Sequence, residues 1–374
     1  MSRIFSLKSD LGDALLFSHM DAGERLGALY DYRLVALSRD AGLDLVKLLG
    51  SPMAVHMSYP GGGERWFHGI VIEAAQTGTV EVEGVSYVTY ALALAPRLWL
   101  LTQRRNSRIF ANRKVPDIVR EVLSGIGYSD ISVKLSGDYP VREYCVQYRE
   151  DDFSFISRLM EQEGIYYYFK HDDSKHTLVL ADGLGAHAPA PGAASLPYLA
   201  AGMEGHREGV SDWGPLSRLH TTVCRLTDYD PLNPRTSLMS RADAGQGVPL
   251  HKVDGLEVFD FPGGFLNHAS PGTSSDAEEV RRYAQVKVDA QNAERACCRG
   301  RSHAVGLAVG SLFKLSESPG SQWDSEYLVT GCTMQLRCLP SLRRHDHTAN
   351  SPWPSHAAAA AFLACAVRAT PRRW

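Results

Sequence analysis

The chain lacks a hydrophobic run long enough to cross a membrane. Its longest apolar run, residues 357–367, would extend only about 16 Å as a helix, whereas the hydrocarbon core of a bilayer is about 30 Å thick. Polar and charged residues also interrupt every apolar stretch of residues 1–20, so the continuous apolar segment of a secretory signal is missing. We therefore expect no membrane insertion, and any export would use a route without a signal peptide.

An excess of charge of either sign is also lacking. The sequence has 39 Lys and Arg against 42 Asp and Glu, which gives a formal net charge of −3. Proteins that bind nucleic acid carry a basic patch or stripe as their electrostatic footprint. The charge balance therefore argues against nucleic acid as a partner.

The cysteines lack the spacing of a metal site or a disulfide framework. They are seven, an odd number, with no CxxC pair and no fixed distance to histidines. This pattern favours small buried hydrophobic side chains. They are Cys145, Cys224, Cys297, Cys298, Cys332, Cys338 and Cys365.

Motifs of catalysis and cofactor binding are absent as well. No GxSxG, HExxH or Walker sequence occurs, and the glycines at 61–63 lack the Lys-Ser/Thr and the helix of a phosphate loop. Glu161 and Glu163 lie two apart on a predicted helix, hence on different faces, which favours solvated side chains over an acid-base pair. We therefore predict no enzyme, no catalytic residue and no cofactor.

One group of residues has the chemistry of metal ligands. His345, Asp346, His347 and His356 supply imidazoles and a carboxylate, which suit zinc. They lie in a C-terminal segment of atypical composition, and we expect no metal there.

The most informative segment that is present runs from residue 151 to 169. Asp151 and Asp152 are N-cap candidates, four apolar residues follow at helical spacing, and Gly164 is placed for a left-handed C-terminal cap. The aromatic run after it predicts a strand. Tyrosine is enriched at interfaces, so Tyr166–Tyr168 are candidates for subunit contact, with a buried core strand as the alternative.

Changes in composition divide the rest of the chain. Residues 1–101 read as β-strands separated by turns, and residues 102–182 as an α+β module. Residues 183–336 begin with a linker rich in Gly, Ala and Pro and continue as strands around a long helix at 276–299. We predict a mainly β fold with two small β-barrel domains, at 1–101 and within 183–336, and a helix-containing module between them.

An internal similarity supports two related barrels. Residues 50–72 and 310–333 each contain a Gly-Ser turn, a strand, a polar connection and an aromatic-led strand with an internal glycine. A glycine in a strand marks a bulge or a tight bend. The alternative is a chance similarity of two hairpins, which a difference in strand order would favour.

Seven blocks in a fixed order resemble the valine-glycine repeat protein G (VgrG) tip proteins of type VI secretion systems, which are related to phage late control protein D and the phage baseplate hub. The resemblance covers residues 1 to about 336. The blocks are 67–74 (FHGIVIEA), 96–110, 115–123 (VPDIVREVL), 142–169, 226–234 (LTDYDPLNP), 259–265 (FDFPGGF) and 300–315.

The resemblance implies a structural hub. A homotrimer with two barrels per subunit would cap a sixfold tube of hemolysin-coregulated protein (Hcp), with effector or adaptor proteins as further partners. Such a protein assembles in the cytoplasm and leaves the cell through the apparatus. The alternative is the baseplate hub of a prophage contractile tail, which is the same kind of protein in another machine.

The C-terminal part departs from the family pattern. Neither the oligosaccharide/oligonucleotide-binding barrel nor the β-helical needle that follows the hub in the family is found. Residues 337–374 contain no glycine, and six arginines against one acidic residue. We interpret the shift as a truncation or a change of reading frame, expect a disordered tail, and leave open whether the shortened copy functions.

Overall fold

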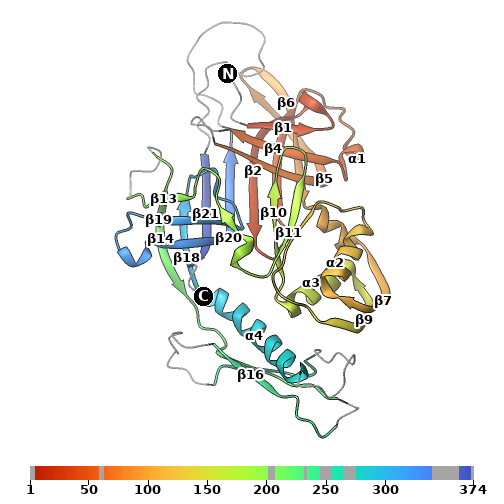
Figure 1. The fold of residues 1–374 in the computed structure, drawn as a ribbon. Helices are drawn as coiled ribbons and strands as arrows, with labels where there is room; N and C mark the ends of the chain where they lie inside the picture. The colour runs from red at the N-terminus through yellow and green to blue at the C-terminus, as the bar shows by residue number, and fades with distance from the viewer. Residues whose placement is uncertain are drawn as a thin grey trace.

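The computed structural model describes residues 5–58, 63–200, 207–230, 234–244, 255–263, 275–338 and 362–371. These residues form mostly strands, as predicted, with four α-helices and several short 3₁₀ turns among them (Figure 1). The turn glycines 61 and 62, and the possible metal ligands at 345–347 and 356, lie outside the described residues. No helix in the described part of the chain is both long and apolar enough to span a bilayer.

The first six strands form one end of a large sheet. Their order in space is β1-β4-β5-β6-β3-β2, with antiparallel neighbours throughout. A short helix, α1 (Leu45–Leu48), begins at Asp44, whose side chain accepts from two backbone N–H groups. The strands are β1 (Phe5–Ser9), β2 (Leu16–Arg25), β3 (Asp31–Ser38), β4 (Pro52–Ser58), β5 (Glu64–Val82) and β6 (Val85–Ala95).

Six later strands form a second unit with the same topology. When the six strands are numbered by their order in the chain, they lie side by side in the order first, fourth, fifth, sixth, third, second. Strands β1 to β6 have the same order, which confirms the predicted internal repeat. The one difference is that the first strand pairs parallel to the fourth. The strands are β13 (Ser195–Pro197), β14 (Val210–Ser217), β18 (Ala296–Ser302), β19 (Ser311–Ser316), β20 (Glu326–Arg337) and β21 (Phe362–Pro371).

The two units are joined into one 13-stranded sheet, which corrects the expectation of two separate barrels. Strand β2 pairs with β3 on one side and with β20 on the other, so neither of its edges is left for β1. The rings of Phe5 on β1 and Phe17 on β2 stack with their centroids 4.6 Å apart. In the second unit an isolated bridge between Tyr198 and Val210 links the segment after β13 to β14. Most of the buried apolar side chains of both units share one core.

The tail and the linker are more ordered than predicted. Residues 362–371, expected to be disordered, form β21, which pairs with β20 and β18 and takes the place that β6 has in the first unit. In this position β21 pairs with the backbone N–H and C=O groups at the edges of β18 and β20, which would otherwise be open. Within the predicted linker, β12 (Ala188–Pro189) and β13 pair parallel to β19.

An α+β module occupies the middle of the chain, as predicted. The β7–β9 ribbon and the β10–β11 hairpin enclose helices α2 and α3 around a separate apolar core. Figure 1 shows the β10–β11 hairpin between the large sheet and these two helices. The elements are β7 (Arg105–Lys114), α2 (Val115–Ser124), β8 (Ile131–Lys134), β9 (Val141–Asp151), α3 (Asp152–Glu163), β10 (Tyr166–His171) and β11 (His176–Ala181).

A small three-stranded sheet packs on one long helix, α4. Strand β15 lies between β16 and β17, and buried residues of β15 and β16 contact α4. The predicted long helix is confirmed, although it ends at Arg295, where β18 begins, and Gly300 lies inside that strand. The elements are β15 (Val223–Leu226), β16 (Ser240–Asp243), β17 (Glu257–Asp260) and α4 (Ser275–Arg295).

Two of the cysteines whose side chains the structure describes differ from expectation, and one of them, Cys338, is only half-buried. Cys145, Cys224, Cys297 and Cys298 are buried free thiols, as predicted. Cys332 is disulfide-bonded, so the prediction is wrong for this residue. Seven cysteines can form up to three disulfides, and sequence spacing does not show which residues meet in a folded sheet.

The helix-to-strand segment at 151–169 forms as its sequence predicts. The Asp151 carboxylate accepts from the Ser154 N–H at 2.7 Å and caps α3, and Gly164 ends the helix with φ 74°. Strand β10 begins two residues later.

We predict that Asp151→Ala lowers the free energy of unfolding by about 1 kcal/mol, because one N-terminal N–H of α3 loses its acceptor. Urea denaturation followed by circular dichroism measures this change. Asp151→Asn, whose side-chain oxygen can still cap the helix, is the matched control. An equal loss in both variants would show that the cap is not the cause.

Candidate interaction surfaces

The tyrosines of β10 are core residues. Tyr167 faces the core of the α+β module and Tyr168 that of the large sheet, and both are almost fully buried. The Tyr168 hydroxyl donates to the Ala186 carbonyl at 3.0 Å, and the Tyr166 hydroxyl lies 2.8 Å from His187 Nε2. Burial raises the pKa of each of these tyrosines. The alternative of a core strand is thus confirmed for Tyr167 and Tyr168, which have no exposed surface to offer a partner.

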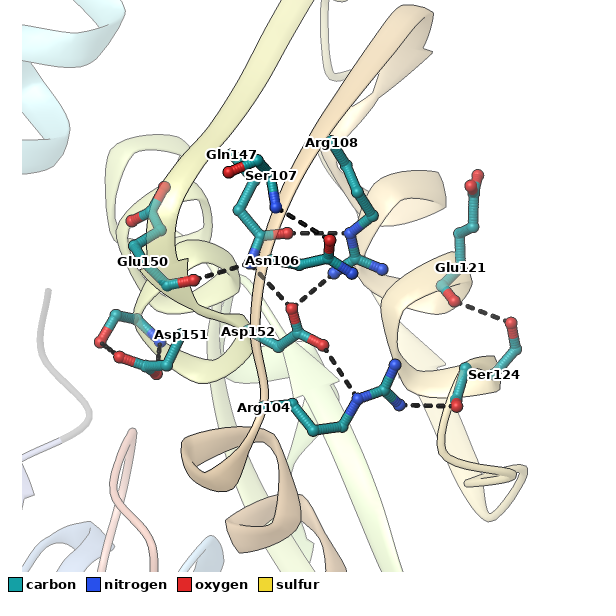
Figure 2. A network of polar contacts seen from close by, with 12 residues as sticks. Arg104, Asn106, Ser107, Arg108, Glu121, Ser124, Gln147, Glu150, Asp151 and Asp152 are labelled. Carbon is teal, nitrogen blue, oxygen red and sulfur yellow. Dashed lines mark hydrogen bonds and ion pairs between the residues drawn. The ribbon is translucent and has the colours of Figure 1, made fainter.

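Asp152 holds the β7–β9 ribbon against the helices, as Figure 2 shows. Its side chain is fully buried at the first turn of α3, where the helix dipole favours a negative charge. One carboxylate oxygen accepts from Arg108 Nη2 at 2.7 Å and from Gln147 Nε2 at 2.8 Å. The other lies 3.5 Å from Arg104 Nε, and Arg104 also donates to the Gly125 carbonyl after α2.

This cluster fixes the inner face of the ribbon and leaves its outer face to solvent. Ile109, Tyr144 and Tyr148 are 61%, 63% and 70% exposed. Arg105, Arg113 and Arg149 on the same two strands are also exposed. Tyrosine and arginine are enriched at protein interfaces, and apolar groups rimmed by charge mark contact sites. The outer face of the β7–β9 ribbon is therefore the first candidate interaction surface.

The small sheet carries a second group of exposed apolar side chains. They lie on or beside β15, β16 and β17, close together in the chain and far from the first surface in the sequence. They are Leu219, Tyr229, Met239, Val258, Phe259 and Phe261. A concentration of large apolar side chains in contact with water is typical of a surface that a partner covers.

Glu163 corrects one prediction. Its side chain is fully buried rather than solvated, and it accepts from Arg142 at 2.8 Å, from the Tyr283 hydroxyl at 3.0 Å and from Arg282. The two partners from α4 are remote in sequence, so helical spacing on α3 alone could not reveal them. Glu161, two residues earlier, is exposed as predicted.

The sequence-based expectations did not include the exposed tyrosines of β9 or a group of histidines. Residues 144–148 alternate, with Tyr144 and Tyr148 outward and Cys145 and Gln147 inward, and this period of two is the signal for the exposed ribbon. His171 and His176 flank a DDSK turn, which predicts that they face each other across a hairpin, as the register shows. Within the described residues no group of three His, Cys, Asp or Glu side chains is placed to hold a metal ion.

Known proteins are similar in sequence over most of this chain. The type VI secretion system spike protein VgrG1c of Pseudomonas aeruginosa is 38% identical over 338 residues, which cover 90% of this chain and 44% of that protein. The chain spans about half the length of the curated relatives it matches.

Solved structures share the fold. An E. coli component of the type VI secretion system, described as similar to the T4 tail proteins gp27 and gp5, aligns over 98% of this chain and 76% of its own, with a TM-score of 0.66 and 19% identity. The 43 kDa tail protein of prophage MuSo2 from Shewanella oneidensis aligns over 98% of both chains, with a TM-score of 0.61 and 11% identity. The family model of the phage tail baseplate hub (GPD) matches residues 23–338. The chain therefore belongs to the phage tail baseplate hub family.

Proposed function

We propose that this chain is the hub part of a type VI secretion spike. The observation that carries the proposal is the 38% identity with a spike protein over 90% of the chain. The hub acts by assembly rather than by catalysis. It forms a homotrimer, caps an Hcp tube and carries effector or adaptor proteins out through the apparatus.

The internal repeat supports this assembly. Two units of equal strand order in each subunit give a trimer six similar units, which suits a tube with sixfold symmetry. The two exposed apolar surfaces are available for contacts between subunits or with cargo. A prophage tail hub remains the second candidate, favoured by the fold shared with the MuSo2 tail protein.

Purified chain analysed by size-exclusion chromatography with light scattering tests the proposal. We expect a mass of three chains, and we expect the trimer to retain purified Hcp rings on a column while a phage tail-tube protein passes through. Retention of the tail-tube protein alone would favour the prophage hub. A strict monomer that retains neither protein would overturn both candidates.

A further inference from the structure

Three histidines, two of them buried and one half-buried, join the α+β module to the large sheet. His68 is on β5 of the sheet, and His171 and His176 are paired across the β10–β11 hairpin of the module. His68 and His176 are almost fully buried, and their Nδ1 atoms are 3.0 Å apart. The Tyr30 ring packs between the hairpin and the sheet, with its centroid 5.0 Å from that of His171.

The hydrogen-bond partners determine where the protons of His68 and His176 lie. The Arg97 N–H donates to His176 Nε2 at 2.8 Å, so His176 carries its proton on Nδ1. That proton is donated to His68 Nδ1, which must then be bare. Neither ring has an acceptor nitrogen left in this contact, because each bare nitrogen already receives an N–H.

His171 contacts both the His68 backbone and Tyr32 of the large sheet. His171 Nδ1 lies 3.2 Å from both the backbone nitrogen and the carbonyl oxygen of His68, and His171 Nε2 lies 3.2 Å from the Tyr32 hydroxyl. Tyr32 in turn donates to Glu24 at 2.7 Å. Arg65 is paired with Glu24 and donates to the Leu307 carbonyl at 2.8 Å, so the chain of contacts reaches the second unit.

The surroundings keep the three rings neutral. Burial lowers the pKa of His176 to about 2, burial and the nearby Arg65 lower that of His171 to about 3, and burial lowers that of His68. The titratable tyrosines at the joint are Tyr30, Tyr32 and Tyr128. The charged groups that act on the three rings are Lys8, Glu24, Arg65, Arg97, Asp130 and Asp172.

We propose that these histidines form an acid-sensitive joint, which releases the β10–β11 hairpin from β5 when the surroundings become acidic. A second proton on His68 or His176 would sit on a nitrogen that now accepts an N–H, so two donors would face each other. A second proton on His171 would place a positive charge near Arg65. The joint can take up protons only by opening. Acid would thereby loosen the α+β module, with its exposed β7–β9 ribbon, from the sheet.

The size of the effect follows from proton linkage. In the opened state each histidine regains an ordinary pKa of about 6.5, so below that pH each one favours opening by about tenfold per pH unit. With three histidines the opening equilibrium approaches about a thousandfold change per unit. The joint is fully closed above pH 6.5 and weakens steadily as the pH falls.

Hydrogen exchange measured by mass spectrometry between pH 7 and pH 5 tests the joint, after correction for the intrinsic pH dependence of exchange. Peptides that contain the His68 and Arg97 amides report opening directly, because these N–H groups donate to the histidine rings. We expect protection there to fall steeply below pH 6.5 while peptides from α2 stay protected. His176→Gln should reduce the slope by about tenfold per pH unit.

His56→Gln is the matched control, since His56 lies on neighbouring β4 and pairs with Glu64 away from the cluster. It should keep the wild-type slope. His171→Gln serves as a second test if His176→Gln does not fold. Equal slopes in the wild type and in a folded cluster variant, or a loss of protection that is the same in α2 as at the joint, would overturn the proposal.

Discussion

Gly310→Ala is expected to destabilise the protein strongly, by several kcal/mol. Gly310 has φ 83°, a conformation that alanine adopts only with strain. An added Cβ would also lie 2.4 Å from the Tyr168 ring, which is far inside van der Waals contact. The ring cannot simply move, because it is buried and its hydroxyl is bonded to the Ala186 carbonyl. Urea denaturation of the purified variant measures the loss.

The repeat itself supplies the matched control. Gly50 opens the equivalent turn of the first unit with φ 80°, and its N–H donates to Val71 as that of Gly310 donates to Val329. A Cβ on Gly50 would meet no atom within 4 Å. Gly50→Ala should therefore cost only the backbone strain, about 1 kcal/mol. If the two variants lose equal stability, the close approach of Tyr168 does not constrain the second unit.

The same pair of turns shows what the sequence could reveal. The Gly-Ser pairs at 50–51 and 310–311 indicated a repeat, and the structure gives both the same geometry. In each turn the serine N–H and hydroxyl donate to the carbonyl three residues earlier: Ser51 to Leu48, and Ser311 to Ala308. A turn of this kind depends on adjacent residues, so the sequence alone can predict it.

The joining of the two units could not be read in that way. The contact of β2 with β20 pairs residues about 300 positions apart, and a strand pattern does not name its neighbour. Strand β21 was missed for a related reason. Residues 362–371 have the composition of an atypical tail, but a strand between two partners is stabilised chiefly by backbone hydrogen bonds, which any sequence without proline in its interior can form.

The sequence did not show where the two candidate interaction surfaces lie. Tyr166–Tyr168 were candidates for subunit contact, with a core strand as the alternative, whereas the exposed tyrosines Tyr144 and Tyr148 lie on β9. The run of aromatics at 166–169 was more conspicuous, but a strand covered on both faces needs apolar residues at every position. Exposure depends on what packs over a strand, and that information is spread over the whole chain.

Glu163 provides the second large effect. We expect Glu163→Ala to lower the free energy of unfolding by about 3 to 5 kcal/mol, because removal of one partner leaves a buried charge uncompensated. The Arg142 side chain is the one most affected, since it is nearly buried and donates to Glu163 and Gln162. Urea denaturation measures the total loss.

Limited proteolysis shows where the loss of Glu163 acts. Glu163 joins α3 to Arg282 and Tyr283 of α4, so the variant should expose α4 to trypsin. Glu161→Ala is the control, since Glu161 is exposed on the same helix and should change stability by less than about 0.5 kcal/mol. Equal effects at the two positions would mean that the buried cluster around Glu163 does not hold the α+β module to helix α4.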